Sequence, residues 1–335
     1  MKKRILEKGG LEVSAVGLGC MGMSHAYGKP LDARQAREVL SAALDLGYTC
    51  FDTAEIYGSS DDPDHNERLI AEAIGSRRNE FVISTKFGIC FDEKAPGAIK
   101  PLVCDSRPEA IRRSVEGSLE RLKTDHIDLY YQHRVDPKVE PEVVADEMSK
   151  LIAEGKILYW GISEALLDYI ARADKVCHVE AVQSRYSMMA RQNGEMFDEL
   201  NRLGIGFVAF SPLANGFLSG AYGENSKFDK STDFRASLAQ FQPEAVRKNQ
   251  ELLGWLEELA QAHNATRAQI SLAWILCKNP SLVPIPGTTK IQRLKENAGA
   301  SEIELSSDEV AEIDKRLSEI PMSEVFTGVK SGSGH

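Results

Sequence analysis

The feature that most constrains the fold of this chain is a repeated alternation of short β-rich runs and longer amphipathic segments. Eight runs are typical of strands, and we expect them at residues 13–19, 48–52, 81–88, 126–134, 157–163, 179–184, 205–212 and 282–287. Helices are expected behind nearly all of them, at residues 32–47, 65–75, 107–123, 141–155, 165–174, 194–204, 248–263, 268–278 and 289–300.

Strands that alternate with helices pair in parallel, and the continuous apolar character of these runs indicates burial on both faces. Eight such units predict an α/β fold of the (β/α)8 TIM-barrel type. A doubly wound parallel sheet is the alternative, because counting strands from one sequence is error-prone. We expect a single domain over residues 1–325, while the ending at 326–335 is typical of a flexible tail or an expression tag.

Two connections are too long to be simple turns. Residues 88–107 and 213–245 both follow expected strands and are rich in Gly, Pro and polar residues with scattered aromatic residues. In a barrel they would lie over the C-terminal face. Long loops in compact domains are usually functional, so we interpret them as ordered lids in preference to disordered insertions.

Composition excludes several classes of protein. The net charge is −10, which argues against a nucleic-acid surface. There is no apolar run of the roughly 20 residues that a membrane span requires, and no apolar segment follows the basic N-terminus as in a secretory signal. The six cysteines form no motif with zinc spacing, so we expect no metal site and a reducing, cytoplasmic compartment.

Polar residues stand at the ends of six of the expected strands. They are Asp52, Lys86, His133, Ser163, Gln183 and Ser211. Each alone has an ordinary structural explanation, such as a lysine that extends to solvent or a histidine satisfied in the core. Together with the nearby Tyr57, however, an acid, a lysine and a histidine form a set that can move protons at the rim where barrel enzymes react.

On these residues the chain resembles the aldo-keto reductase family over roughly residues 5–300. The segments that carry the resemblance are FDTAEIYG, STKFG, IDLYYQHRVDP, GISEA, FSPL and IPGTTKIQRLKENAGA, in the order in which the family has them. The last of them and YYQHRVDP look closest to bacterial and plant members and to the potassium-channel β-subunit-like branch. The resemblance implies a TIM barrel that reduces a carbonyl with a nicotinamide cofactor.

The resemblance also implies a catalytic tetrad of Asp52, Tyr57, Lys86 and His133. Tyr57 would donate the proton, and a Lys86 ammonium beside it would lower the pKa of the phenol. Asp52 would hold Lys86 charged and oriented, and His133 would hydrogen-bond the substrate oxygen. Glu55 matches no position of the tetrad and is interpreted as a loop carboxylate with a local role.

No GxGxxG fingerprint follows an early strand, so the cofactor residues come from the resemblance. Ser163 and Gln183 would bind the nicotinamide carboxamide. Phe210 would stack on the ring, with Ser211 and Leu213 in the same segment, although many relatives have Tyr at position 210. Glu164 stands where many relatives have Asn, which weakens the expectation of a second carboxamide contact there.

The segment PGTTKIQR resembles the loop that holds the adenosine 2′-phosphate. Gly287 and Thr288 would donate to the phosphate near a helix N-terminus, and Arg293 would bind it. Glu296 and Asn297 match adenine contacts. These residues favour NADPH over NADH, although many relatives have Lys at position 287.

Three functions compete on this sequence. The favoured one is reduction of a small aldehyde or ketone, in a protein that could form a homo-oligomer. The second is a nicotinamide-sensing accessory subunit with little or no turnover. A metal-dependent hydrolase is disfavoured, because no His-x-His pair or carboxylate cluster stands at the strand ends. Met21, Met23, Tyr27 and Phe87 could line a substrate pocket but are more typical of a core.

Overall fold

The structure is a computed structural model that describes residues 1–6, 10–59, 62–92 and 101–325. Within them, the eight expected strands form one parallel sheet. In sheet order they are β12 (Leu282–Pro284), β11 (Gly206–Phe210), β10 (Ala181–Arg185), β9 (Ile157–Ser163), β8 (Ile127–Gln132), β5 (Val82–Phe87), β4 (Cys50–Asp52) and β3 (Leu18–Gly19).

The two edge strands of this sheet, β3 and β12, meet and close it into a barrel. The backbone N–H of Gly17 donates to Pro284 O at 2.9 Å, and that of Gly19 donates to Pro286 O at 3.4 Å. This close approach requires glycine at position 19, because a Cβ atom would lie 2.9 Å from the carbonyl oxygen of Ile285. The TIM-barrel prediction is therefore confirmed and the doubly wound alternative is excluded.

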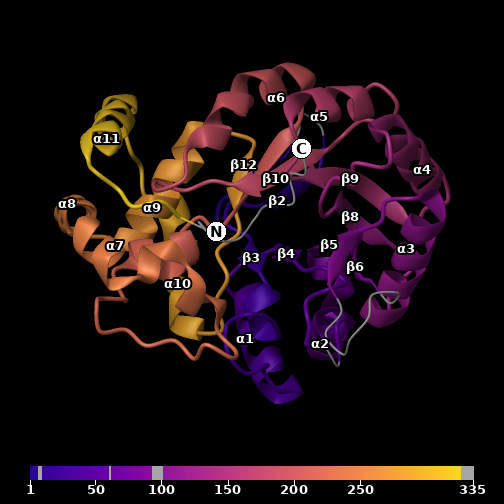
Figure 1. Ribbon diagram of the computed structural model, residues 1–335, viewed down its shortest axis with the longest axis horizontal. Coiled ribbons are helices and arrows are strands. Elements are labelled where there is room, and N and C mark those ends of the chain that lie inside the picture. The colour runs from indigo at the N-terminus through magenta and orange to yellow at the C-terminus, as the bar shows by residue number, and fades with distance from the viewer. Residues whose placement is uncertain (7–9, 60–61, 93–100, 326–335) are drawn as a thin grey trace.

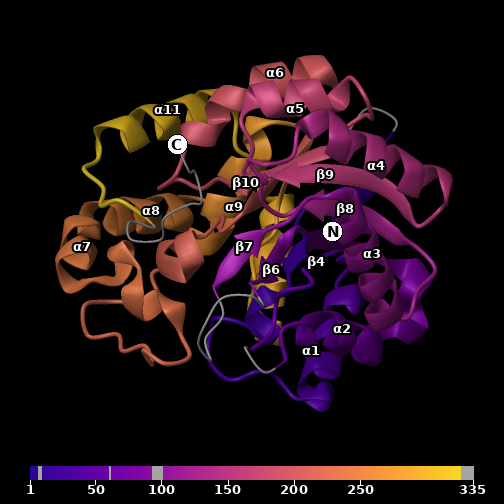
Figure 2. The same cartoon turned by 45° about the vertical axis from the view of Figure 1, so that its right-hand side comes forward.

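Helices surround the ring of strands, as Figures 1 and 2 show. In chain order they are α1 (Ala33–Asp45), α2 (His65–Ile74), α3 (Pro108–Leu122), α4 (Pro141–Ala153), α5 (Leu167–Asp174), α6 (Phe197–Leu203), α7 (Pro243–Lys248), α8 (Gln250–Ala262), α9 (Arg267–Lys278), α10 (Ile291–Gly299) and α11 (Ser307–Glu319). Local sequence explains their ends: α1 begins at a capping box in which Asp32 and Gln35 each accept the other's backbone N–H.

A hairpin that the sequence analysis did not predict closes the N-terminal end of the barrel. It pairs β1 (Lys3–Ile5) with β2 (Glu12–Ser14). Leu6, Leu11 and Val13 of this hairpin pack against the side chains inside the barrel. The expected strand 13–19 is therefore divided, because the chain leaves the hairpin before it enters the barrel at β3. The hairpin therefore fills the barrel interior at this end.

The two long connections are built differently. The first contains a hairpin of β6 (Ile89–Phe91) and β7 (Leu102–Cys104), while residues 93–100 between them lie outside the described residues. The second contains three short 3-10 helices, η4 (Ala214–Ser219), η5 (Phe234–Ser237) and η6 (Ala239–Phe241), before α7. The predicted tail at 326–335 also lies outside the described residues. Of the helices that are described, none has the length and apolar character to cross a membrane.

Candidate active site

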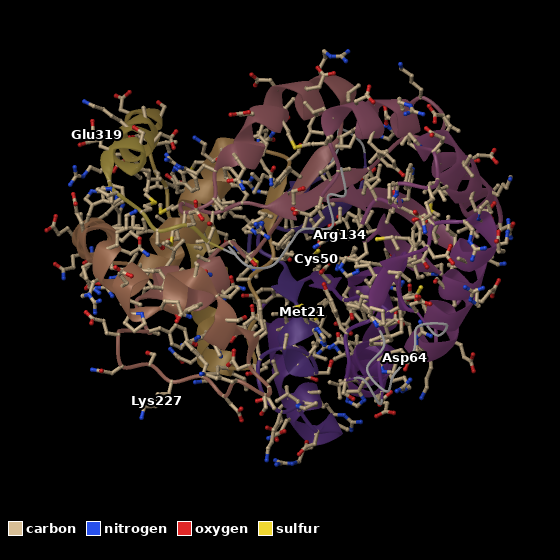
Figure 3. All side chains as sticks on the ribbon, in the orientation of Figure 1. Met21, Cys50, Asp64, Arg134, Lys227 and Glu319 are labelled. Atoms are coloured by element: carbon tan, nitrogen blue, oxygen red, sulfur yellow. The ribbon has the colours of Figure 1, made fainter. Side chains whose placement is uncertain are left out.

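A cavity of about 550 Å³ opens at the C-terminal end of the barrel. All ten residues predicted to bind the cofactor line it: Ser163, Gln183, Phe210, Ser211, Leu213, Gly287, Thr288, Arg293, Glu296 and Asn297. Of the predicted tetrad, Asp52, Tyr57 and His133 line it too, while Lys86 is buried behind them. Met21, another lining residue, is marked near the middle of the molecule in Figure 3.

Asp52 and Lys86 form a buried ion pair at the floor of this cavity. Lys86 Nζ donates to Asp52 Oδ1 at 2.6 Å and to the carbonyl oxygen of Thr53 at 2.7 Å. The other carboxylate oxygen, Oδ2, accepts from Ser84 Oγ at 2.9 Å and from Gln183 Nε2 at 2.8 Å. Burial opposes the ammonium, but the interactions with the Asp52 carboxylate and the Tyr57 phenol outweigh burial and raise the pKa of Lys86. The lysine therefore remains a cation inside the barrel.

Tyr57 lies between this ion pair and His133. Lys86 Nζ is 5.1 Å from the centre of the Tyr57 ring, and the His133 ring lies edge-on to it at a centroid distance of 5.7 Å. Burial raises the pKa of Tyr57, and the opposing effect of Lys86 does not overcome it. The expected lowering effect of Lys86 is therefore present, but burial outweighs it and the net shift of this pKa is upward. Tyr57 holds its proton at neutral pH, as a proton donor must.

His133 is a neutral imidazole in this setting. Burial lowers its pKa well below the usual value, and the nearby charges of Lys86 and Arg134 act in the same direction. Its Nδ1 atom is buried, and no hydrogen-bond partner for it occurs among the described residues. An unsatisfied buried polar atom of this kind is uncommon in folded proteins.

The loop that carries Tyr57 is held by Asn66, a fully buried residue of α2 that sequence reasoning missed. Its side chain accepts from Thr53 Oγ1 at 2.6 Å and donates to Ser24 Oγ at 2.5 Å and to Cys20 O at 3.1 Å. The Ser24 hydroxyl in turn donates to Tyr57 O at 2.8 Å. One amide thus connects the loops after β3 and β4.

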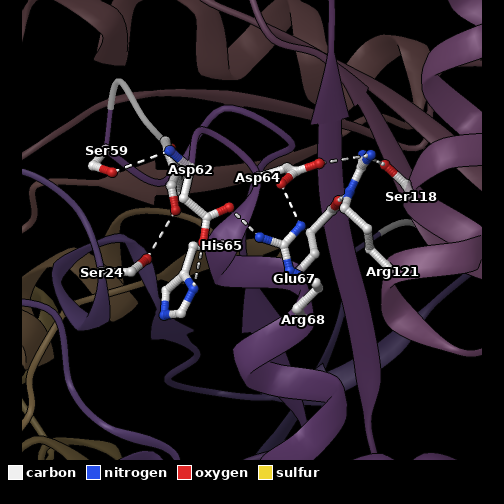
Figure 4. A network of polar contacts seen from close by, with 10 residues as sticks. Ser24, Ser59, Asp62, Asp64, His65, Glu67, Arg68, Ser118 and Arg121 are labelled. Atoms are coloured by element: carbon white, nitrogen blue, oxygen red, sulfur yellow. Dashed lines mark hydrogen bonds and ion pairs between the residues drawn. The ribbon is translucent and has the colours of Figure 1, made fainter.

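A second polar network fixes the start of α2, immediately after this loop (Figure 4). Arg68 pairs with Asp62 and Asp64. Arg121 of α3 donates from Nε to Glu67 Oε2 at 2.6 Å, and its Nη1 lies 3.3 Å from Asp64 Oδ2. Because Glu67 is fully buried and both its oxygens are bonded, the network connects α2 and α3 rigidly.

The opposite end of the cavity is positively charged. Lys290 and Arg293 line it at the N-terminus of α10, and within the described part of the chain neither side chain has an ion-pair partner. The Thr288 hydroxyl accepts from the Lys290 backbone N–H at 3.1 Å. Unpaired cations at a helix N-terminus form a site suited to phosphate, so the donor set fits the predicted cofactor.

The second long connection covers this cavity as a strap, here defined as residues 213–241. Its backbone bonds the loop after β3, with Gly28 N donating to Thr232 O at 2.9 Å and Phe234 N to Ala26 O at 3.0 Å. Arg235 pairs with Asp233 and lies 4.7–5.1 Å from the ring centres of three aromatic residues. These rings belong to Tyr27, Tyr222 and Phe228.

The comparison with known families agrees with this geometry. Residues 15–317 match the model of the aldo/keto reductase family. The chain belongs to the aldo/keto reductase family. It is 40% identical over 321 residues to a probable aldo-keto reductase 1 of Glycine max, an alignment that covers 95% of this chain and 89% of the relative.

Two solved structures of bacterial proteins are similar to this aldo-keto reductase. A glycerol dehydrogenase from Gluconobacter oxydans has a TM-score of 0.82 at 25% identity, over 92% of this chain and 93% of the other. An aldo-keto reductase from Bacillus halodurans in its holo form has a TM-score of 0.76 at 26% identity, over 97% and 98%. The family resemblance read from the sequence is confirmed, and with it an oxidoreductase of a family that generally uses nicotinamide cofactors.

Sequence reasoning missed several lining residues of this aldo-keto reductase. Arg134, Arg185, Asn215 and Arg235 line the cavity and were not predicted. For Arg134 a signal existed, since it follows His133 at the end of an expected strand. Met21 and Tyr27, considered for a pocket, do line the cavity, whereas Met23 and Phe87 lie in the core.

Proposed function

We propose that this aldo-keto reductase reduces an aldehyde or ketone to the alcohol, reversibly, with NADPH as the cofactor. The proposal rests on one arrangement: a protonated phenol, Tyr57, on the floor of a cavity, backed by the buried Lys86–Asp52 pair and flanked by a neutral His133. These groups are the ones needed to protonate an oxygen atom on which negative charge develops.

The cofactor would be held by the lining residues already described. Ser163 and Gln183 offer polar groups for a carboxamide, and Phe210 offers an apolar face for a ring. When bound, the nicotinamide supplies the hydride. No nucleophile or covalent intermediate on the protein is then required.

The protein's own groups would handle the proton. Tyr57 donates its proton to the substrate oxygen as charge builds there, and the Lys86 ammonium stabilises the phenolate that remains. Asp52 keeps that ammonium charged and oriented, since an unpaired buried cation is costly. His133, as a neutral imidazole, donates a hydrogen bond to the same oxygen and so fixes the carbonyl.

The first test is turnover by wild type and Tyr57→Phe, measured as NADPH consumption with a panel of small aldehydes and ketones. We expect the variant to lose at least about 99% of kcat, in line with general acid catalysis worth 100-fold or more, while NADPH binding measured by calorimetry is kept. Undiminished turnover in the variant contradicts the role of Tyr57. NADPH binding without turnover of any carbonyl by wild type favours the accessory-subunit function instead.

The preference for NADPH would come from Arg293 and Lys290 at the start of α10. Replacing Arg293 by Ala should weaken NADPH binding about tenfold and leave NADH binding unchanged, because only NADPH carries the extra phosphate. Lys295→Ala is the matched control, since Lys295 is an exposed residue of the same helix and does not line the cavity. An unchanged ratio of the two dissociation constants in Arg293→Ala would contradict the phosphate assignment.

A further inference from the structure

The charges that line the cavity do not balance at the end where Tyr57 and His133 lie, which is called the reaction end below. Five cations line it: Arg134, Arg185, Arg235, Lys290 and Arg293. Arg235 is neutralised by Asp233, and Arg185 lies beside the Glu164 carboxylate. Lys290 and Arg293 stand at the other end, beside α10. Arg134 is therefore the lining cation left to account for at the reaction end.

Arg134 has only neutral partners within the described residues. Its Nη1 atom donates to His133 O at 2.6 Å and to Ser163 Oγ at 3.2 Å. The cavity lining contains two acids, Asp52 and Glu296. Asp52 is engaged by Lys86, and Glu296 belongs to α10 at the far end, so neither balances Arg134.

Arg134 also lies close to two of the proposed catalytic residues, His133 and Tyr57. It directly follows His133 at the end of β8, and its charge acts on the Tyr57 phenol and on the His133 imidazole. Since Nη1 is engaged, the rest of the guanidinium fork remains for a bound molecule. An Arg fork of this kind matches the two oxygens of a carboxylate, and it binds them far better than a neutral group.

We propose that the carbonyl compound reduced in this cavity carries a carboxylate, and that Arg134 binds it while Tyr57 and His133 hold the carbonyl oxygen. This inference rests on the proposed reductase function and narrows its substrate to the class of oxo acids. Arg134 acts on specificity: it orients the substrate by its charged end, so the benefit appears in kcat/KM for acids alone.

The test compares two aldehydes that differ in charge and little in shape, 4-formylbenzoate and its methyl ester. For wild type we expect kcat/KM for the acid to exceed that for the ester by about tenfold or more, the effect of one charge-assisted hydrogen bond. Arg134→Gln, which keeps an N–H donor but no charge, should bring the ratio close to one. Arg134→Lys should restore part of it.

The matched control is Arg34→Gln, which makes the same charge change on the exposed surface of α1 and should leave the ratio as in wild type. A wild-type ratio of one or less overturns the proposal, and so does an unchanged ratio in Arg134→Gln. A raised KM for NADPH in Arg134→Gln with an unchanged acid-to-ester ratio assigns Arg134 to the cofactor and likewise overturns it.

A second measurement separates this proposal from the proposed function. Calorimetry gives the dissociation constants of 4-formylbenzoate and its ester for Tyr57→Phe loaded with NADPH, where no turnover is needed. Tighter binding of the acid that is lost in Tyr57→Phe/Arg134→Gln supports the carboxylate site even if wild type reduces neither compound. Equal binding of acid and ester refutes the carboxylate site, whatever the result for catalysis.

Discussion

The ion pair of Lys86 and Asp52 is costly to bury, because both charges are removed from water. It is stable only while each charge has its partner: Lys86 Nζ donates to Asp52 and to Thr53 O, and both Asp52 oxygens accept hydrogen bonds. Loss of either partner should therefore affect both the free energy of unfolding and the proposed proton donation by Tyr57.

Lys86→Met should lower the free energy of unfolding by about 3 kcal/mol, because Asp52 is left as an unpaired buried charge, and should reduce kcat about 100-fold or more. The double variant Lys86→Met/Asp52→Asn removes both charges and should recover most of the stability but none of the activity. Urea unfolding and NADPH consumption measure the two effects. Recovery of activity in the double variant would contradict the role given to Lys86.

Glu55, interpreted from the sequence as a loop carboxylate, leads to a pH prediction. Burial raises its pKa from 4.5 to about 7, although Ser114 and Arg121 act against this. In the unfolded chain the group ionises near 4.5, so between that pH and about 7 only the folded state keeps the proton. Glu55 therefore favours folding at low pH, and this contribution is lost as pH rises through 7.

The comparison of Glu55→Gln with wild type checks this sign. We expect the variant to gain stability relative to wild type by about 2 kcal/mol between about pH 5 and about pH 8, because glutamine does not titrate. Urea unfolding at both pH values measures the difference. A relative gain for wild type on raising the pH would show that the folded state favours the ionised carboxylate.

Strand-end residues were predictable because parallel strands of a barrel end at one rim. That rule alone brought Asp52, His133, Ser163 and Gln183 together. Asn66 was not predictable in the same way, since an Asn at the start of a helix usually serves as a cap and nothing in its neighbours indicates three buried partners. The charge balance around Arg134 also depends on residues distant in sequence, which only the folded chain brings close.

At the scale of elements, the turn after Tyr57 depends on Gly58. A Cβ atom there would lie 1.9 Å from Asp62 O and 2.7 Å from the carbonyl carbon of Pro63, both backbone atoms that cannot move aside independently. The paired bonds between Ser59 and Asp62, 3.1 and 3.2 Å long, would have to open.

Gly58→Ala should displace the Tyr57 loop and reduce kcat about tenfold or more, the effect of roughly 1.4 kcal/mol. Gly75→Ala is the matched control at the end of α2, where an added Cβ meets nothing within 4 Å, and it should keep full activity. Stability should fall in the first variant and rise by about 0.5 kcal/mol in the second. Equal kinetics of the two variants would show that the loop tolerates the added Cβ.

The barrel helices were predictable because each repeats an apolar face and begins or ends at a recognisable residue. α11 was missed although Ser306 and Glu309 form a capping box at its start, because it follows the eighth unit, where the repeat gives no reason to expect another helix. The β1–β2 hairpin was missed for a different reason. It pairs short, partly exposed strands, which carry little apolar signal.

At the scale of the whole molecule, the strap connects a late part of the sequence with an early one across the cavity. It follows β11, and its backbone bonds the loop after β3. A cofactor bound in this cavity, as proposed above, would lie under residues 213–241, and we expect it to leave past Arg235 and its aromatic partners. Arg235→Gln should speed NADPH release at least about fivefold, the effect of roughly 1 kcal/mol, as measured by stopped-flow fluorescence. Arg202→Gln is the control, since Arg202 forms an exposed ion pair with Glu199 within α6 and does not line the cavity. Equal release rates in both variants would show that the strap does not limit exit.

The seam between β3 and β12 has a consequence for how the protein is made. Gly19 and Gly287 meet across it, yet a ribosome that adds about 5–20 residues each second reaches Gly287 roughly 15 s to 1 min after Gly19. During that interval the edge of β3 lacks its β12 partner and is open to other chains. The hydrogen bond from Gln183 to the Asp52 carboxylate likewise cannot form until a residue 131 positions later has been synthesised. Slower synthesis of the C-terminal third should therefore increase aggregation of the nascent chain more than slower synthesis of the first third.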